Sequence, residues 1–260
     1  MNVKPKKHLG QHFLKDETVC QRIAEAVQPE GKYTKVLEIG PGMGALTKYL
    51  MKRTDFETSV IEIDRESVAY LKVNFPDLTD RIFANDFLHT DPREIMGTDT
   101  FAVVGNFPYN ISTQILFRVL EFKDNIPEVV GMFQKEVAVR IAEGPGSRDY
   151  GIVSVLLQAF YDIEYLFTVD EHVFIPPPKV KSGVIRLKRN SVKNLACDEK
   201  LFKQVVKQAF SQRRKTLRNS LKPFQDGFPA FFENHKELLQ RRPETLSVEE
   251  FVYITQQFQV

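Results

Sequence analysis

The chain has 260 residues, of which 42% are hydrophobic and 27% are charged, and its formal net charge at pH 7 is +2. This length allows one large domain and a small one, and the composition is that of an ordinary globular protein. No apolar run approaches the length of a membrane helix, and the basic N-terminus lacks the apolar core of a signal peptide. The only cysteines, Cys20 and Cys197, lie far apart without metal-ligand spacing. We therefore expect two free thiols, no metal site and a cytoplasmic protein.

The hydrophobic pattern predicts strands that alternate with helices over most of the chain. The predicted strands are 35–39, 58–63, 81–84, 101–104, 129–133, 162–169 and 180–187. The predicted helices are 18–27, 45–52, 67–75, 135–141, 151–160 and a helix capped by Ser112 that runs to Leu120. This alternation predicts a doubly wound parallel sheet. Only helical periodicity remains past Leu195, so the predicted domains are 1–195, which begins with a basic arm at 1–15, and 196–260.

Positive charge is concentrated in two segments that flank the acidic middle of the chain. Residues 1–15 carry four lysines and no acid, and residues 200–222 carry eight cationic side chains and no acid. A charge run usually marks a solvated face, but such a face normally includes some anions. The segregation therefore indicates a polyanionic partner. The residues expected to contact its phosphates are Lys4, Lys6, Lys7, Arg213, Arg214, Lys215 and Arg218.

The tetrapeptide Asn106-Phe107-Pro108-Tyr109 follows a predicted buried strand, at the edge where open α/β sheets bind ligands. The Asn106 side-chain oxygen and the carbonyl of residue 107 can accept the two hydrogens of an exocyclic amine on a nucleobase. Pro108 fixes the local backbone, and Tyr109 offers a face for base stacking. An Asn is a poor general base, so the expected contribution is positioning and electrostatics. Taken alone, the four residues fit a plain proline turn equally well.

A glycine turn, Gly40-x-Gly42-x-x-Ala45, joins the first predicted strand to a helix and is compatible with a dinucleotide site. Glu62, at the end of the second strand, would bind ribose hydroxyls of either NAD or S-adenosylmethionine. The charge of Glu38 opposes a pyrophosphate but suits a sulfonium and an amine. Asp86 is placed to accept a hydrogen bond from an adenine amino group. These features favour S-adenosylmethionine, although a tight turn and helix caps would also explain them.

The chain resembles the KsgA family of ribosomal RNA adenine N6-dimethyltransferases over nearly its whole length. The matching segments are Gly10-Gln11-His12-Phe13-Leu14, 36–42, 60–64, 105–112, 134–137, 176–180 and Gln212-Arg213-Arg214-Lys215-Thr216. Two positions depart from the family pattern, because position 12 is more familiar as Asn and position 107 as Leu. We expect neither to change the chemistry.

The resemblance implies a Rossmann-like seven-stranded methyltransferase sheet with a small all-helical C-terminal domain that binds RNA. It implies transfer of methyl groups from S-adenosylmethionine to N6 of two adjacent adenines near the 3′ end of small-subunit (16S) ribosomal RNA. It further implies a monomer that takes part in small-subunit biogenesis and acts on a precursor of the 30S subunit, with no role for DNA or a membrane. The family's cofactor contacts fall on six positions, and the neighbours Glu38, Gly42, Ile63 and Phe87 complete the expected cofactor site. The six are His12, Leu14, Gly40, Glu62, Asp86 and Asn106.

Three other functions remain open on sequence grounds. A large-subunit ribosomal RNA adenine methyltransferase of the macrolide-resistance type would use the same Asn106 motif. The segments 176–180 and 212–216 look more like the small-subunit enzymes. A non-catalytic assembly factor would not need Glu62, Asp86 and the Asn106 motif together. An NAD oxidoreductase would need an acid/base pair, and His89 and His172 are isolated histidines.

Overall fold

The computed structural model describes residues 3–212 and 214–259, which form two compact units. The first unit contains the chain up to Ala138 together with Ile163–Arg189. The second unit contains Val139–Asp162 and the chain from Asn190 onward. Residues 139–162, which the sequence placed in the large domain, thus belong to the helical unit. Their helix α7 (Ile152–Gln158) contacts α8 (Glu199–Phe210) and α12 (Val248–Gln257) and buries apolar side chains there.

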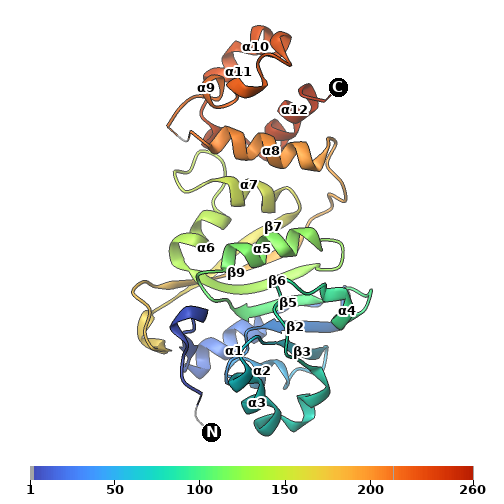
Figure 1. Ribbon diagram of the computed structural model, residues 1–260, viewed down its shortest axis with the longest axis vertical. Coiled ribbons are helices and arrows are strands. Elements are labelled where there is room, and N and C mark those ends of the chain that lie inside the picture. The colour runs from blue at the N-terminus through green and yellow to red at the C-terminus, as the bar shows by residue number, and fades with distance from the viewer. Residues whose placement is uncertain (1–2, 213, 260) are drawn as a thin grey trace. The chain divides into compact units, whose positions relative to one another are not determined.

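The first unit is built on a seven-stranded sheet with the strand order β4-β3-β2-β5-β6-β9-β7 (Figure 1). The strands are β2 (Lys35–Ile39), β3 (Glu57–Ile61), β4 (Ile82–Phe83), β5 (Ala102–Asn106), β6 (Glu128–Gln134), β7 (Tyr161–Val169) and β9 (Ser182–Arg189). The five strands from β4 to β6 pair in parallel, but β9 pairs with β6 in the antiparallel direction. The seven-stranded α/β sheet is confirmed, and the expectation of a purely parallel sheet is wrong at β9.

Helices flank the strands of this sheet, and all of them except α4 were predicted from the hydrophobic periodicity. They are α1 (Glu17–Glu25), α2 (Thr47–Leu50), α3 (Arg65–Asn74), α4 (Pro92–Met96), α5 (Ser112–Glu121) and α6 (Lys135–Ala142). Helix α1 shows why such a segment is helical. The Asp16 side chain caps it by accepting a hydrogen bond from Val19 N–H, 3.0 Å away. Its buried face, which includes Ile23, packs into one apolar cluster with Val36 of β2 and Val104 of β5.

The start of α5 differs from the expectation. Ser112 was predicted to cap this helix, but it is the first helical residue, and the preceding Ile111 makes no side-chain capping bond. The Ser112 hydroxyl donates instead to the carbonyl of Tyr109, 3.2 Å away. The capping prediction is therefore wrong, and Ser112 ties α5 to the loop that precedes it.

The beginning of the chain lies against a distant loop of the same unit. Strand β1 (Phe13–Leu14) pairs antiparallel with β8 (Phe174–Ile175), and Figure 1 shows the blue start of the chain beside this yellow segment. Three short 3-10 helices belong to the same unit: η1 (Lys7–Leu9), η2 (Pro76–Arg81) and η3 (Glu171–Val173). Two-residue strands carry no periodicity, so this pairing could not be predicted from the hydrophobic pattern.

The second unit is helical after the end of β9. Besides α7, α8 and α12 it contains α9 (Leu217–Ser220), η4 (Lys222–Phe224), α10 (Pro229–Asn234), α11 (Lys236–Gln240) and η5 (Pro243–Thr245). The helical periodicity expected past Leu195 is present in α8, where Phe202, Val205, Val206, Ala209 and Phe210 are buried and Leu201 is half-buried. Within the described residues, no helix is long and apolar enough to cross a membrane.

Candidate active site

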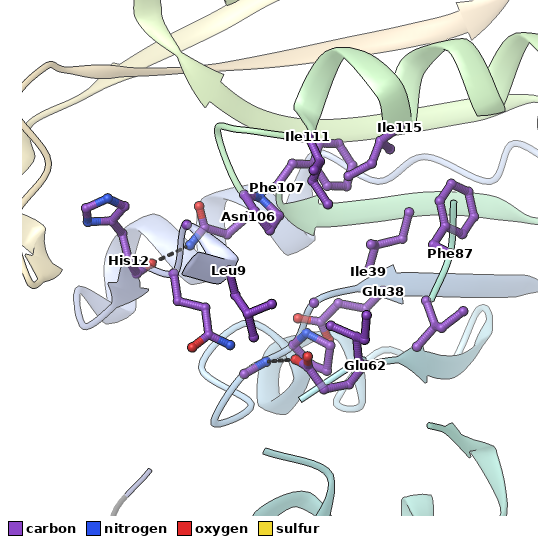
Figure 2. A pocket seen from close by; sticks show the side chains of 18 of the residues that line it. Leu9, His12, Glu38, Ile39, Glu62, Phe87, Asn106, Phe107, Ile111 and Ile115 are labelled. Carbon is purple, nitrogen blue, oxygen red and sulfur yellow. Dashed lines mark hydrogen bonds between the residues drawn. The ribbon is translucent and has the colours of Figure 1, made fainter. Parts of the chain in front are cut away.

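A cavity of about 300 Å³ lies at the carboxyl ends of β2, β3 and β5, in the first unit (Figure 2). This is the edge of a parallel sheet at which α/β folds bind ligands. Every residue predicted to bind the cofactor lines the cavity, together with the Asn106 tetrapeptide. The predicted cofactor and acceptor residues therefore meet in one place, although they come from five separate parts of the chain.

The glycine turn after β2 allows the N-terminal segment to pack closely against it. Gly42 has φ of +56°, a left-handed conformation that favours glycine, and a Cβ there would lie 2.8 Å from the ring of Phe13. Its N–H donates a hydrogen bond to Glu62 Oε2, 3.1 Å away. The turn is thus held in place by the Glu62 carboxylate, and Phe13 of the N-terminal segment packs against it.

Glu62 lies just beyond β3, because that strand ends at Ile61, two residues earlier than predicted. Its Oε1 accepts a hydrogen bond from Asp64 N–H, 2.8 Å away, so both carboxylate oxygens have a backbone donor. Burial raises the pKa of Glu62, and the backbone hydrogen bonds from Asp64 and Gly42 counteract this rise. Each oxygen retains a lone pair that can accept a hydroxyl hydrogen. The arrangement suits a pair of ribose hydroxyls.

Glu38 occupies the deepest part of the site, at 2% exposure. Its Oε2 accepts a hydrogen bond from Thr47 Oγ1 at 2.6 Å. Burial raises the pKa of Glu38 to about 8, and the nearby Glu62 adds to this rise, while the Thr47 hydrogen bond opposes it. Glu38 was expected to be charged, but with this pKa its side chain is largely protonated at neutral pH. A cationic group brought next to it would favour the charged form.

The side of the cavity after β4 offers both an apolar and a polar surface. Ile63 is 53% exposed although it is a large apolar residue, and it lines the cavity, as does the buried Phe87. Asp86 also lines the cavity, and its side chain accepts from Leu88 N–H at 2.9 Å and contacts His89 Nδ1 at 2.7 Å. Asp86 therefore stabilises its own turn. That local role does not exclude a contact with a ligand, because a carboxylate has further acceptor positions.

Asn106 is the last residue of β5, and its side-chain amide is fixed in one orientation. Its Nδ2 donates to the main-chain carbonyl of His12 at 2.9 Å, as Figure 2 shows. Because the amide nitrogen is used in this bond, Oδ1 is the end left to accept a hydrogen from a ligand. It makes no hydrogen bond to any other part of the described chain. This is the orientation that the proposed contact with an exocyclic amine requires.

Phe107 and Tyr109 play different parts in the tetrapeptide. The Phe107 side chain is 1% exposed and points into the core, where it meets Phe133 edge to face at 5.2 Å between ring centroids. Only its backbone can therefore serve the site. Tyr109 remains half-buried at the cavity, and its hydroxyl and Ser182 Oγ are 2.6 Å apart. Burial raises the pKa of Tyr109, so the ring stays neutral at physiological pH.

His12 connects three segments through its ring and backbone. Its Nδ1 lies 2.7 Å from the carbonyl oxygen of Pro176, and its ring stacks on Tyr109 with 5.5 Å between centroids. In Figure 2 the imidazole lies at the edge of the drawn group, away from Glu38 and Glu62. The histidine in place of the family's usual Asn therefore contacts the acceptor side of the site. Leu14, the other predicted contact in this segment, is buried against the cavity.

The sequence missed several residues that line the cavity. They are His8, Leu9, Gly10, Gln11, Asn85, Ile111 and Ile115. Four of them belong to the segment that precedes His12, which has no strand or helix periodicity of its own. The only indication in the sequence that these four residues belong to the site was that Gly10 and Gln11 lie in the first matching family segment.

The residues predicted to contact phosphates differ in their surroundings. Arg214, Lys215 and Arg218 are exposed in the second unit, and within the described residues they form no ion pair. Lys4 and Lys7 are exposed in the first unit. Lys6 forms ion pairs with Asp64 and, at 3.2 Å, with Glu66. Arg213 lies outside the described residues. Across residues 3–212 and 214–259, no group of three or more potential metal ligands is present.

Comparisons with known proteins agree with this geometry. A sequence model described as "Ribosomal RNA adenine dimethylase" matches residues 2–259. A Flavobacterium johnsoniae protein named ribosomal RNA small subunit methyltransferase A is 58% identical over 99% of this chain and 97% of its own length. A Bacteroides thetaiotaomicron protein of the same name is 58% identical over 98% and 94%.

Two solved structures have the same fold over most of the chain. A dimethyladenosine transferase from Plasmodium falciparum superposes with a TM-score of 0.77 at 22% identity, over 95% of this chain and 97% of the other. The 23S rRNA methyltransferase ErmE superposes with a TM-score of 0.67 at 25% identity, over 95% and 99%. Both comparisons extend over the sheet and the C-terminal helices alike.

Proposed function

The chain belongs to the ribosomal RNA adenine dimethylase family, and we propose that the cavity between β2, β3 and β5 is where it methylates adenine. It is an S-adenosylmethionine-dependent enzyme that transfers methyl groups to N6 of adenines in small-subunit ribosomal RNA. The observation that carries the site assignment is the Asn106 amide, because its bond to the His12 carbonyl leaves Oδ1 as an acceptor facing the cavity. The two adjacent adenines near the 3′ end of 16S rRNA are the substrate.

The cofactor half of the site is formed by the carboxyl groups and the exposed isoleucine. When bound, S-adenosylmethionine supplies a methyl group on a cationic sulfonium. Glu62 would accept hydrogen bonds from the ribose hydroxyls, and Ile63 and Phe87 would contact the adenine ring. Asp86 would accept a hydrogen bond from the amino group of that ring. Glu38, below the glycine turn, would balance the positive charge of the amino-acid end. The exposure of Ile63 supports this assignment, since a large apolar side chain beside a cavity is covered once a ring binds there.

The acceptor half is formed by the residues after β5. The Asn106 Oδ1 and the Phe107 carbonyl would accept hydrogens from N6 and orient its lone pair. Tyr109, whose ring is held by His12 on one face and by Ser182 at its hydroxyl, would stack against the base. Asn106 is neutral, so this set acts through orientation and electrostatics rather than by removing a proton. After the first methylation N6 keeps one hydrogen, which one acceptor suffices to hold.

The large-subunit alternative has weaker support than the small-subunit assignment. The 23S rRNA methyltransferase ErmE is 25% identical to this chain, whereas the small-subunit methyltransferases from Flavobacterium johnsoniae and Bacteroides thetaiotaomicron are 58% identical. The non-catalytic alternative would leave the fixed Asn106 amide and the paired Glu62 carboxylate without a purpose. We propose further that the protein acts as a monomer in the cytoplasm on a 30S precursor, where Lys4, Lys7, Arg214, Lys215 and Arg218 contact phosphates.

The test is mass spectrometry of ribosomal RNA after separate incubations of unmethylated 30S subunits and of 50S subunits with the protein and isotopically labelled S-adenosylmethionine. We expect two adjacent residues of N6,N6-dimethyladenosine in the wild-type reaction. Asn106→Ala should lower the rate at saturating RNA by about 100-fold or more while RNA affinity changes little, since lost orientation affects the chemical step. Asn74→Ala is the matched control, because the Asn74 amide bonds only to its own helix at the Tyr70 carbonyl. Labelled 23S RNA, or only monomethyladenosine after exhaustive reaction, would contradict the assignment.

A further inference from the structure

The N-terminal segment lines the cofactor cavity and contacts the chain at the ends of three neighbouring strands. At one end, Lys6 contacts Asp64, which follows β3. In the middle, Phe13 lies against the glycine turn that follows β2. At the other end, the His12 carbonyl accepts from Asn106 at the end of β5. Because β3, β2 and β5 are adjacent in the sheet, residues 6–14 form a cover over three strand ends in a row.

Lys6 is the only charged attachment of this cover among the described residues. Its ammonium forms ion pairs with Asp64 and with Glu66, the latter at 3.2 Å. Its backbone N–H donates to Gln11 Oε1 at 2.9 Å, which closes the turn around η1 and holds Gln11 at the cavity wall. The contacts of Lys6 thus fix both the path of the segment and the residues that face the cavity.

The partner of Lys6 is itself part of the framework of the cofactor site. The Asp64 side chain is 2% exposed, and it also accepts from Glu66 N–H and Ser67 Oγ at the start of α3. The Asp64 N–H donates to Glu62 Oε1 at 2.8 Å. Burial alone would raise the pKa of Asp64, but hydrogen bonds from Lys6, Ser67 and Glu66 outweigh it and lower that pKa. Asp64 therefore connects the Lys6 ammonium to the Glu62 carboxylate, which is the group proposed to bind the ribose.

We propose that Lys6 is a positioning residue of the cofactor site, and that its pairing with Asp64 holds residues 6–14 closed over the bound cofactor. The inference rests on the proposed function, because it concerns the same cavity. It differs from the role that the charge pattern predicted, which was contact with an RNA phosphate. A lysine bound to a buried carboxylate and to a second acid has its charge already balanced, so it adds little to the attraction of a polyanion. Lys7 and Lys4 remain exposed for that purpose.

The experiment compares three variants of the full-length protein: Lys6→Gln, Lys6→Arg and the matched control Lys7→Gln. Calorimetry measures the affinity for S-adenosylhomocysteine, and filter binding at several salt concentrations measures the affinity for 30S subunits. We expect Lys6→Gln to weaken cofactor binding by about three- to tenfold, as for the loss of a partly buried charged hydrogen bond. It should raise the KM for S-adenosylmethionine, while turnover at saturating cofactor and the salt slope stay at wild-type values. Lys6→Arg should restore the affinity, and Lys7→Gln should leave it unchanged.

Two results would overturn the inference. One is wild-type cofactor affinity in Lys6→Gln together with weaker 30S binding and a reduced salt slope, which would make Lys6 a phosphate contact. The other is an equal loss of cofactor affinity in Lys6→Gln and Lys7→Gln, which would indicate a general effect of charge. A double-mutant cycle with Asp64→Asn locates the effect, since the second substitution should add little once Lys6 is neutral. Dimethyladenosine formation by Lys6→Gln at saturating cofactor and RNA separates this outcome from a failure of the proposed function.

Discussion

Burial raises the pKa of both Glu62 and Glu38, but the two carboxyl groups differ in the donors that oppose this rise. Glu62 accepts two backbone hydrogen bonds, whereas Glu38 accepts one from Thr47 at almost complete burial. The sequence identified both positions, because an acidic residue within an apolar strand or directly after one stands out. It could not show the protonation state of Glu38, because that state depends on how completely the surrounding protein excludes water.

Cofactor binding should release a proton from Glu38. Its pKa is raised to about 8, so the carboxyl is mostly protonated at pH 7 before the cofactor binds. A bound cation favours the ionised form and lowers this pKa, so binding must expel the proton. The affinity for the cofactor should therefore increase as the pH rises towards about 8, and it should level off above that value.

Calorimetry of S-adenosylhomocysteine binding at pH 7 in phosphate and in Tris measures this release. These buffers have different heats of ionisation, so the observed enthalpies should differ in proportion to the protons expelled. Glu38→Gln keeps an acceptor for Thr47 but cannot titrate, and it also accounts for any proton lost by the ligand's own amine. Identical buffer dependence in the wild type and this variant would rule out Glu38 as the source.

At the scale of secondary-structure elements, the position of the Asn106 tetrapeptide depends on the packing of the Phe107 ring against glycines in two neighbouring strands. Phe107 packs over Gly105 of β5 and Gly131 of β6, and a Cβ on Gly131 would lie 2.3 Å from the Phe107 ring. These two glycines are opposite each other in the sheet. The sequence predicted both strands, but a space shared between them depends on the register of the sheet, which no local pattern contains.

Gly131→Ala should therefore impair both stability and catalysis. Overpacking of this kind costs about 1–3 kcal/mol of folding free energy, and the displaced Phe107 backbone should lower turnover. Denaturant unfolding and single-turnover methylation measure the two effects. Phe107→Leu in the same chain should recover part of each loss, because the smaller side chain vacates the space. Gly144→Ala is the control, since nothing lies within 4 Å of its Cβ position. Equal losses in the control, or no rescue, would contradict this account.

Elements without a repeating pattern were the ones that the sequence could not supply. The pairing of β1 with β8 involves two residues on each strand, and it brings Phe13 opposite Ile175 from far along the chain. Helix α7 was recognised as a helix, but its grouping with the C-terminal helices depends on which apolar face it meets. The long apolar strands β2, β5 and β6 were predicted within a few residues, since buried parallel strands are distinct from their surroundings.

At the scale of the whole molecule, the distribution of charge along the chain could be predicted from the sequence alone, because locating charged residues requires no knowledge of the fold. What the structure adds is the state of each cation. Lys6 is paired with buried Asp64, whereas Arg214, Lys215 and Arg218 are exposed and, within the described residues, have no acidic partner. A net charge counts these cations equally, but only an unpaired cation can release counterions from an RNA phosphate on binding.

Neutralising Arg214, Lys215 and Arg218 together to glutamine should weaken 30S binding and make it less dependent on salt. Each lost phosphate contact lowers the slope of log affinity against log salt by roughly 0.7–0.9, so three contacts correspond to about 2–3. Filter binding over a range of roughly 50 to 200 mM salt gives this slope. Cofactor affinity should remain at the wild-type value, because phosphate contacts position the RNA and do not form the cavity. Lys52→Gln with Lys72→Gln removes exposed charge from the first unit and should leave the slope unchanged. If the control and the triple variant lowered the slope in proportion to their charge, the attraction would be a property of net charge rather than of these three residues.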